Sequence, residues 1–290
     1  MPSCLTRLLS ITLLLLLGGC MSRGIPLASG SGEQPAARAL LQQSAEAHGL
    51  AAFRQIDDIS VAYAGEWYGL VTKIQPTLID ADFRQGSQER IIFKGGPLVG
   101  QHHLGPKGSK QVIRRDRDVQ VFYNDIPTSD HDGLAAAALV ADGYRMFLTG
   151  PFYFLDGNLS LALGDDEVVD GRPCATLVAV RRPGHGLSAE DGYRLFIDRD
   201  NHLLRRVRFT MEGLASTQGA IAEVDFFDHQ KIAGVTWPTR FYERLRKPIP
   251  NLPVHDWRLI GLDVNRGLTA ADISGPAFSA KAAPPARRID

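Results

Sequence analysis

Cysteine is scarce in this chain, which contains Cys4, Cys20 and Cys174 in 290 residues. Cys4 lies in a segment that we expect to be removed, and Cys20 has a separate predicted role, so Cys174 is left as the single free thiol. No intramolecular disulfide can then form, even in an oxidising compartment. The stretch 174–178 (CATLV) is apolar, and a cysteine in such a setting behaves as a small buried hydrophobic residue, not as a nucleophile.

The chain also lacks an excess of charge and a long hydrophobic run. It contains 32 Lys and Arg against 32 Asp and Glu, and removal of residues 1–19 takes away only one of them, Arg7. A neutral chain has no basic footprint for nucleic acid or for an anionic lipid surface. The run 8–17 is apolar but too short to span a bilayer core, which needs about 20 residues.

Catalytic and metal-binding motifs are absent from the sequence. The eight histidines include the adjacent pair His102 and His103, which would face opposite sides of a strand, and no two histidines are three or four residues apart, as two metal ligands on one helix face would be. The segment 105–110 (GPKGSK) lacks the order of a phosphate loop, and the segment 184–188 (GHGLS) reads as a loop. Because acid–base or nucleophilic chemistry needs positioned titratable groups, we expect no enzymatic activity, no cofactor and no metal.

The N-terminus has the layout of a secretory signal peptide. Arg7 precedes the apolar run 8–17, and small residues lead into Cys20. Residues 17–20 (LGGC) also resemble the lipobox of bacterial lipoproteins. The resemblance implies that residues 1–19 are removed and that Cys20 is acylated on its thiol and on its new amino group, for example with palmitate. The alternative is an ordinary cleaved signal whose last residue is a cysteine.

The same resemblance predicts where the protein resides. Three acyl chains on Cys20 would exceed the two signals that stable membrane anchoring requires. Met21, and not an aspartate, follows the cysteine. In lipoprotein sorting of the enterobacterial type this implies transport to the outer membrane, with the protein facing the periplasm.

Composition divides the rest of the chain into three parts. Residues 20–35 form a Gly- and Ser-rich tether, and residues 279–290 (SAKAAPPARRID) are predicted to be a disordered tail. No interior stretch reads as a linker, so residues 36–278 are predicted to form one domain.

Two helices and many antiparallel strands are expected in this domain. Apolar spacing predicts a helix over 35–56, where Gly49 weakens the pattern or ends the helix, and an Ala-rich helix over 129–147 with Ser129 or Asp130 as its cap. Period-two alternation and the turns at 169–172 (VDGR) and 232–235 (IAGV) predict hairpins. The fold class is therefore α+β, with a strongly curved antiparallel sheet and one or two helices covering its concave side.

The C-terminal half, 166–278, resembles the LolA/LolB-like superfamily of envelope proteins. The matching elements are Asp-Gly at 170–171, Ile-Asp at 197–198 followed by LLR at 203–205, and GVTWP at 234–238. The resemblance implies a half-open β-barrel plugged by helices, with an apolar cavity for acyl chains. These motifs are turns and strand starts, so no functional residue is carried over and lipoprotein transport does not follow.

Alternation places one apolar face opposite the arginines of the same strands. This face is predicted to line a cavity for a lipid, an acyl chain or another hydrophobic ligand. The predicted lining residues are Leu195, Ile197, Phe209, Met211, Phe226 and Trp237. In the alternative the same residues form a filled core, and the protein is a scaffolding lipoprotein that acts through its surface.

Overall fold

The computed structural model describes residue 25 and residues 34–155 and 159–273. The predicted signal peptide 1–19, Cys20, Met21, most of the tether and the tail 279–290 lie outside the described residues. Among the described helices, none combines the length and the apolar character that crossing a membrane requires.

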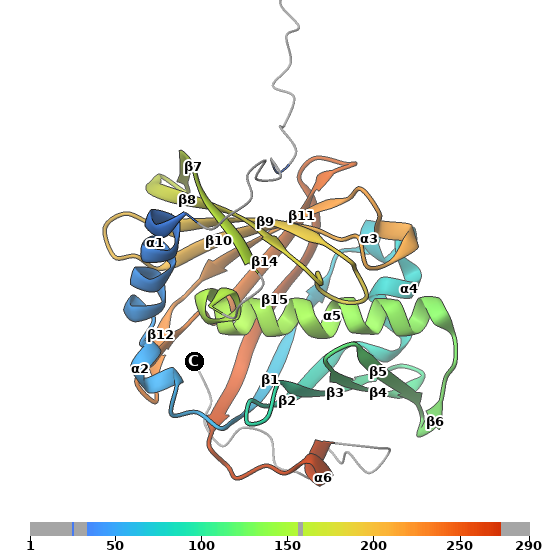
Figure 1. Ribbon diagram of the computed structural model, residues 1–290. Coiled ribbons are helices and arrows are strands. Elements are labelled where there is room, and N and C mark those ends of the chain that lie inside the picture. The colour runs from blue at the N-terminus through green and yellow to red at the C-terminus, as the bar shows by residue number, and fades with distance from the viewer. Residues whose placement is uncertain (1–24, 26–33, 156–158, 274–290) are drawn as a thin grey trace, which may run out of the picture.

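One antiparallel sheet of 13 strands dominates the structure, in the order β6-β5-β4-β3-β2-β1-β15-β14-β11-β10-β9-β8-β7 (Figure 1). Its first half consists of β1 (Asp58–Trp67), β2 (Gly86–Ile92), β3 (Leu98–Gly105), β4 (Gly108–Arg115), β5 (Asp118–Tyr123) and β6 (Ile126–Pro127). Its second half consists of β7 (Leu159–Val169), β8 (Arg172–Arg181), β9 (Asp191–Asp198), β10 (Leu204–Thr210), β11 (Ile221–Phe227), β14 (Arg240–Lys247) and β15 (Leu252–Val264). The pairing of β1 with β15 joins the two halves.

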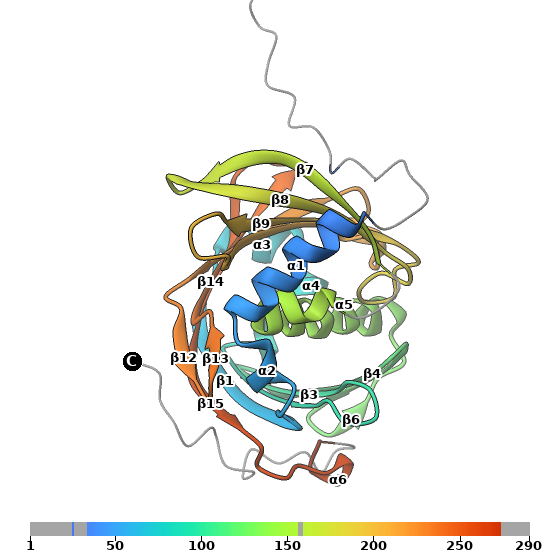
Figure 2. The ribbon, with the colours of Figure 1, turned by 60° about the vertical axis from the view of Figure 1, so that its left-hand side comes forward.

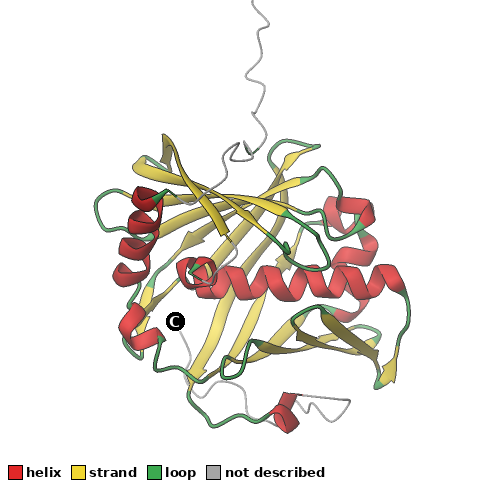
Figure 3. Ribbon diagram, viewed as in Figure 1, coloured by secondary structure: helices red, strands yellow, loops and turns green. Residues whose placement is uncertain are grey.

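The sheet curls around two helices without closing, since β6 and β7 remain at its edges. The long helix α5 (His131–Thr149) crosses the concave face, and α1 (Pro35–Ala47) lies beside it (Figures 2 and 3). This arrangement confirms the predicted fold class. The other elements are α2 (Leu50–Phe53), α3 (Gly69–Ile74), α4 (Pro76–Ile79), α6 (Ala270–Ile273), the 3-10 turns η1 (Ala81–Phe83), η2 (Gly150–Phe154) and η3 (Ala215–Thr217), and the separate hairpin β12 (Gln230–Ile232) and β13 (Val235–Trp237).

The helix ends follow local rules. Asp130 caps α5, because its carboxylate accepts a hydrogen bond of 2.8 Å from the backbone N–H of Gly133. The helix predicted over 35–56 is interrupted at Gly49, which has a φ of +93°. A Cβ there would lie 2.5 Å from the carbonyl oxygen of Gly234, so backbone conformation and close packing both require glycine.

Both predicted hairpin turns are present. Asp170 and Gly171 have positive φ angles of 48° and 78° between β7 and β8, and Ala233 and Gly234 have 51° and 81° between β12 and β13. Two successive residues with positive φ give the turn whose twist matches antiparallel strands. The segment 105–110 forms the end of β3, the turn after it and the start of β4.

The two faces of the second half of the sheet differ as the alternation predicts. Leu195, Val207 and Phe209 belong to the core cluster inside the curve. The convex face carries a ladder of charges, in which Glu223 on β11 pairs with Arg208 on β10 at 2.6 Å and with Arg244 on β14 at 2.7 Å. Burial alone raises the pKa of Glu223, but the guanidiniums of Arg206 and Arg208 hold it below its usual value.

Side chains, not strand pairing, connect the two ends of the curled sheet. Arg114 at the end of β4 donates to the carbonyl oxygen of Gly186 at 2.6 Å, and Arg117 donates to those of Leu187 and Ser188 at 2.6 and 2.8 Å. The 184–188 loop lies between β8 and β9, so these bonds tie the loop to the far side of the opening.

Candidate functional site

An apolar cavity of about 160 Å³ lies between residues 139–147 of α5 and the α3–α4 segment. The β10–β11 and β14–β15 connections complete its wall. It is lined by Trp67, Val71, Ile74, Gln75, Leu78, Ile79, Leu139, Val140, Gly143, Tyr144, Phe147, His185, Phe209, Met211, Ser216, Thr217, Gln218, Ala220, Glu243, Leu245, Pro248, Ile249 and Val254. An apolar wall with a few polar groups is typical of small-molecule sites.

The cavity has an apolar rim. Ile74 on α3 and Ile249 after β14 line the cavity, yet they are 42% and 43% exposed. Leu70, one helical turn before Ile74, is 52% exposed. Large aliphatic side chains therefore gather at the surface where the cavity approaches solvent, and such clusters mark binding sites more often than isolated exposed residues do.

Gly143 leaves a gap in the cavity wall. It lies within α5, where glycine is about 1 kcal/mol less favourable than alanine. A Cβ at this position would contact no atom within 4 Å. Residue 143 therefore faces open space, and the missing side chain contributes to the volume of the cavity.

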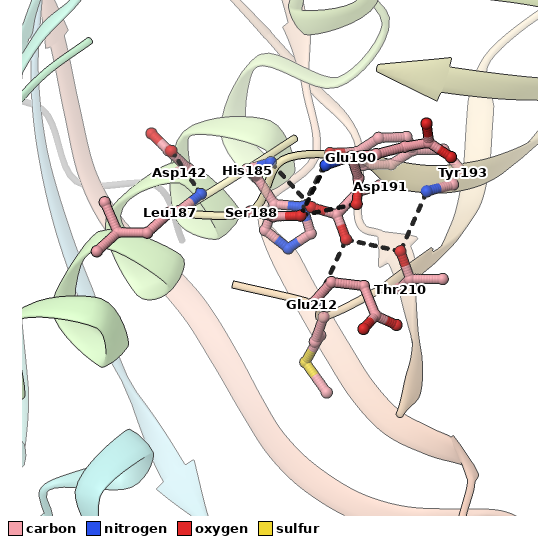
Figure 4. Close-up of polar contacts among 12 residues, drawn as sticks. Asp142, His185, Leu187, Ser188, Glu190, Asp191, Tyr193, Thr210 and Glu212 are labelled. Carbon is pink, nitrogen blue, oxygen red and sulfur yellow. Dashed lines mark hydrogen bonds and ion pairs between the residues drawn. The ribbon is translucent and has the colours of Figure 1, made fainter. Parts of the chain in front are cut away.

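His185 supplies a polar atom to this wall from the 184–188 loop (Figure 4). Its side chain is 1% exposed, and its Nδ1 lies 3.2 Å from Asp191 and 2.8 Å from the hydroxyl of Tyr193. Asp191 also accepts from the hydroxyl of Thr210 at 2.6 Å. Burial alone raises the pKa of Asp191, but its hydrogen bond with His185 contributes to holding the pKa below its usual value.

This network orients the imidazole. An ionised Asp191 can only accept, so the proton of a neutral His185 ring lies on Nδ1 and its Nε2 is a hydrogen-bond acceptor. Nε2 is buried and has no hydrogen-bond partner among the described residues. The loop itself is fixed by Asp142 on α5, which accepts from the backbone N–H of Gly186 at 2.8 Å.

Two further wall residues also have a buried polar atom without a hydrogen-bond partner, as His185 has at Nε2. The hydroxyl of Tyr144 and the indole N–H of Trp67 have no hydrogen-bond partner among the described residues. Most buried polar side-chain atoms in proteins are paired. Three residues of this wall therefore carry a buried polar atom that could pair with a polar group entering the cavity.

The six residues predicted to line a cavity are all buried in the core cluster, on the concave side. Phe209 and Met211 lie on the wall of the cavity. Leu195, Ile197, Phe226 and Trp237 do not: they pack against neighbouring core residues, and the indole of Trp237 donates to the carbonyl oxygen of Ile232 at 3.1 Å. Whether any of the six contacts a ligand stays a prediction.

Sequence reasoning missed most of the wall. Residues 69–79 of α3 and α4 and the connection around 216–220 have no strong period, so strand alternation could not include them. The Ala-rich pattern of α5 predicted a covering helix but did not distinguish Gly143 from its neighbours. The sequence places His185 only in a loop, and Asp191, six residues later, is the one signal of its buried partner.

The other half of the concave face combines apolar core residues with buried polar ones, which the sequence also did not predict. Glu89 on β2 and Gln101 on β3 are opposite each other and share a hydrogen bond of 2.6 Å in the interior. Burial raises the pKa of Glu89 to about 8. Lys110 on β4 is buried against Asp80 at 2.5 Å, and burial lowers its pKa to about 8.

The described residues contain neither a cluster of metal ligands nor an accessible thiol. Within residues 34–155 and 159–273, no three His, Cys, Asp or Glu side chains come together as metal ligands. Cys174 is buried with Val169 and Phe196 beneath the convex face, and burial raises the pKa of its thiol.

No family model and no curated protein matches this sequence. Solved structures do resemble it. A LolA superfamily protein from Nitrosomonas europaea aligns with a TM-score of 0.52 at 14% identity, over 82% of this chain and 97% of that protein. A DUF1329 family protein from Desulfovibrio piger aligns with a TM-score of 0.50 at 12% identity, over 84% and 99%. The chain has a LolA-like fold.

The LolA-like fold confirms what the turn and strand motifs indicated. At such low identities the similarity extends to the fold alone, because one fold hosts many functions.

Proposed function

We propose that this chain is a lipid-anchored protein of the bacterial envelope that binds an apolar or amphiphilic ligand in the α5 cavity and catalyses no reaction. The observation that carries the proposal is the cavity itself: its wall is mostly apolar, and exposed aliphatic side chains form its rim. Ser216 and Thr217 carry the aliphatic hydroxyls of the described wall, and these donate to Gln75 and to the carbonyl oxygen of Met211, not to His185.

The cavity volume limits what enters. A cavity of about 150 Å³ lined by aliphatic and aromatic side chains binds a molecule the size of benzene. The cavity of 160 Å³ therefore accommodates one end of a lipid, either a terminal part of an acyl chain or a ring. The rest of the ligand would extend past Ile74 and Ile249 along the aliphatic rim.

His185 selects among amphiphiles. A neutral His185 ring presents Nε2 as an acceptor, which favours a ligand that carries a hydroxyl or N–H group over a pure hydrocarbon. The acceptor is held in place by Asp191, so no rearrangement is needed for binding.

The envelope location rests on the sequence and on the neighbours. The lipobox-like segment 17–20 supports acylation of Cys20, and the similar structure from Nitrosomonas europaea carries the name LolA superfamily. Met21 supports the outer membrane, with the protein on the periplasmic side. The membrane partner is reached through the acyl chains of Cys20.

The small cavity volume favours one competing function. Four of the six predicted lining residues are packed core, as a scaffolding lipoprotein with a filled interior would have. Such a protein would act through its surface and would carry no bound ligand.

Native mass spectrometry separates the two functions. The full chain is extracted from its own membrane in mild detergent and measured under native and denaturing conditions. Ligand binding predicts an additional non-covalent mass in the native spectrum, while the denatured chain keeps only the acyl mass on Cys20. A native mass equal to the denatured mass would favour the scaffold.

A further inference from the structure

A second cleft, distinct from the α5 cavity, is rich in arginine. It has a volume of about 440 Å³ and lies between the end of β4, the end of β8 and the residues of α5 that face away from the apolar cavity. Five arginines line it, namely Arg114, Arg117, Arg145, Arg181 and Arg182, against the two carboxylates Asp116 and Asp142. This excess is concentrated in one place in a chain whose formal net charge is zero.

Carboxylates in the structure neutralise only part of this charge. Asp142 pairs with Arg114 at 3.0 Å and with Arg145 at 3.7 Å, and the exposed Arg182 pairs with Glu190. Arg117 is held by backbone carbonyl oxygens, and Arg181 by the carbonyl oxygen of Tyr153 at 3.1 Å. Among the described residues, neither Arg117 nor Arg181 forms an ion pair.

The arginines are fixed in place before any ligand arrives. The guanidiniums of Arg145 and Arg181 lie 4.8 and 4.6 Å from the centre of the same aromatic ring, that of Tyr153. Arg114 is only 4% exposed, and its Nε and that of Arg145 are buried without a hydrogen-bond partner among the described residues. Cationic donors that are positioned in advance lose little entropy when they bind an anion.

We propose that this cleft is a binding site for a phosphate group, contacted chiefly by Arg145, Arg181 and Arg117. Guanidinium groups match the geometry of phosphate oxygens with paired hydrogen bonds, which a lysine cannot do. The phosphate belongs either to a lipid headgroup or to a soluble compound. This site does not depend on ligand binding in the α5 cavity.

The test uses the purified full chain in a non-ionic detergent. Calorimetry measures the binding of inorganic phosphate. In a second arm, micelles containing phosphatidic acid are compared with micelles containing diacylglycerol of the same acyl composition. If inorganic phosphate binds and phosphatidic acid does not, the ligand is a soluble compound. If phosphatidic acid binds more tightly than inorganic phosphate, the ligand is a lipid headgroup. Binding of neither phosphate nor phosphatidic acid would overturn the proposal.

Variants show whether the binding occurs in this cleft. Arg181→Gln and Arg145→Gln are each expected to weaken phosphate binding at least tenfold. Arg115→Gln is the matched control, since Arg115 is exposed on β4 outside the cleft and its loss changes the net charge equally. Equal weakening in the Arg115 variant would indicate unspecific attraction and contradict the site.

A conservative variant distinguishes a loss of phosphate binding from misfolding. Arg181→Lys keeps the charge and loses the paired donors, so it is expected to fold with the wild-type circular dichroism spectrum and to bind phosphate more weakly. Wild-type affinity in a folded Arg181→Lys variant and a folded Arg145→Gln variant would remove these arginines from the site.

Discussion

His48 connects α1 to two strands through both nitrogens of its ring. Nδ1 lies 2.8 Å from the carbonyl oxygen of Thr236, and Nε2 accepts from the backbone N–H of Leu204 at 3.0 Å. The N–H of Leu204 needs an acceptor, so the neutral ring fits and the protonated ring does not. Burial, with the contact to Thr236 opposing it, lowers the pKa of His48 to about 4.

Stability is therefore expected to fall in mild acid. An unfolded histidine has a pKa of about 6.5, so the contribution of His48 is complete above this pH and is lost as the pH falls towards 4. Urea unfolding at pH 7 and pH 5 measures the loss. His48→Gln should be less stable at pH 7 and show a smaller decrease between the two pH values. The control His131→Gln, at an exposed position, should keep the full decrease. An unchanged pH dependence in His48→Gln would contradict this role.

The contribution of Glu89 to stability changes with pH in the opposite direction to that of His48. Burial raises its pKa to about 8, whereas the unfolded value is close to 4.5. Its contribution is complete below pH 4.5 and is lost as the pH rises towards 8. Glu89→Gln keeps an acceptor for Gln101 and removes the titration, so its melting temperature should exceed that of the wild type at pH 8 and differ less at pH 5. If Glu89→Gln melted at a lower temperature than the wild type at pH 8, the Glu89 carboxylate would be ionised in the folded protein.

At the scale of elements, cross-strand charge pairs hold the convex face of β10, β11 and β14 together. Glu223 is opposite both Arg208 and Arg244 in the strand register and is fully buried. Removing one partner of a buried pair leaves an unpaired charge.

Glu223→Gln is expected to lower the free energy of unfolding by about 3 kcal/mol, the usual cost of breaking a buried ion pair. The exposed pair of Asp228 with Arg258 offers the control, because Asp228→Asn should cost less than about 1 kcal/mol. Denaturant unfolding of both variants compares them directly. Equal costs would show that the ladder contributes no more than surface pairs do.

The elements differ in how far their sequence predicted them. The Asp170-Gly171 turn and the cap at Asp130 were predictable because local chemistry decides them. Alternation also placed Phe209 and Met211 correctly on the concave side. Alternation could not distinguish a cavity wall from packed core. The difference depends on whether a helix distant in sequence fills the space opposite the strand, and at Gly143 it does not. The interior position of Glu89 and Gln101 likewise depends on sheet curvature, which no local pattern encodes.

At the scale of the whole molecule, the proposed acylation of Cys20 predicts that the protein is attached to a membrane. Acyl chains contribute about 0.8 kcal/mol per buried methylene to membrane binding. Cys20→Ser is therefore expected to move the protein from the membrane pellet to the soluble envelope fraction, as immunoblots of the two fractions would show. Continued sedimentation of the variant, together with a wild-type chain free of acyl mass, would contradict lipidation.

Filling the α5 cavity tests the central claim most directly. In Gly143→Leu, a side chain enters open space and a helix gains a better helix former, so the variant should be more stable than the wild type. Gly86→Leu adds the same side chain on β2, away from the cavity and also without a contact within 4 Å. The measurement is native mass spectrometry of each protein after mild extraction from its membrane. The account predicts a non-covalent ligand mass on the wild type and on Gly86→Leu, and its loss from a stable Gly143→Leu. The same ligand mass on all three proteins would contradict binding in this cavity.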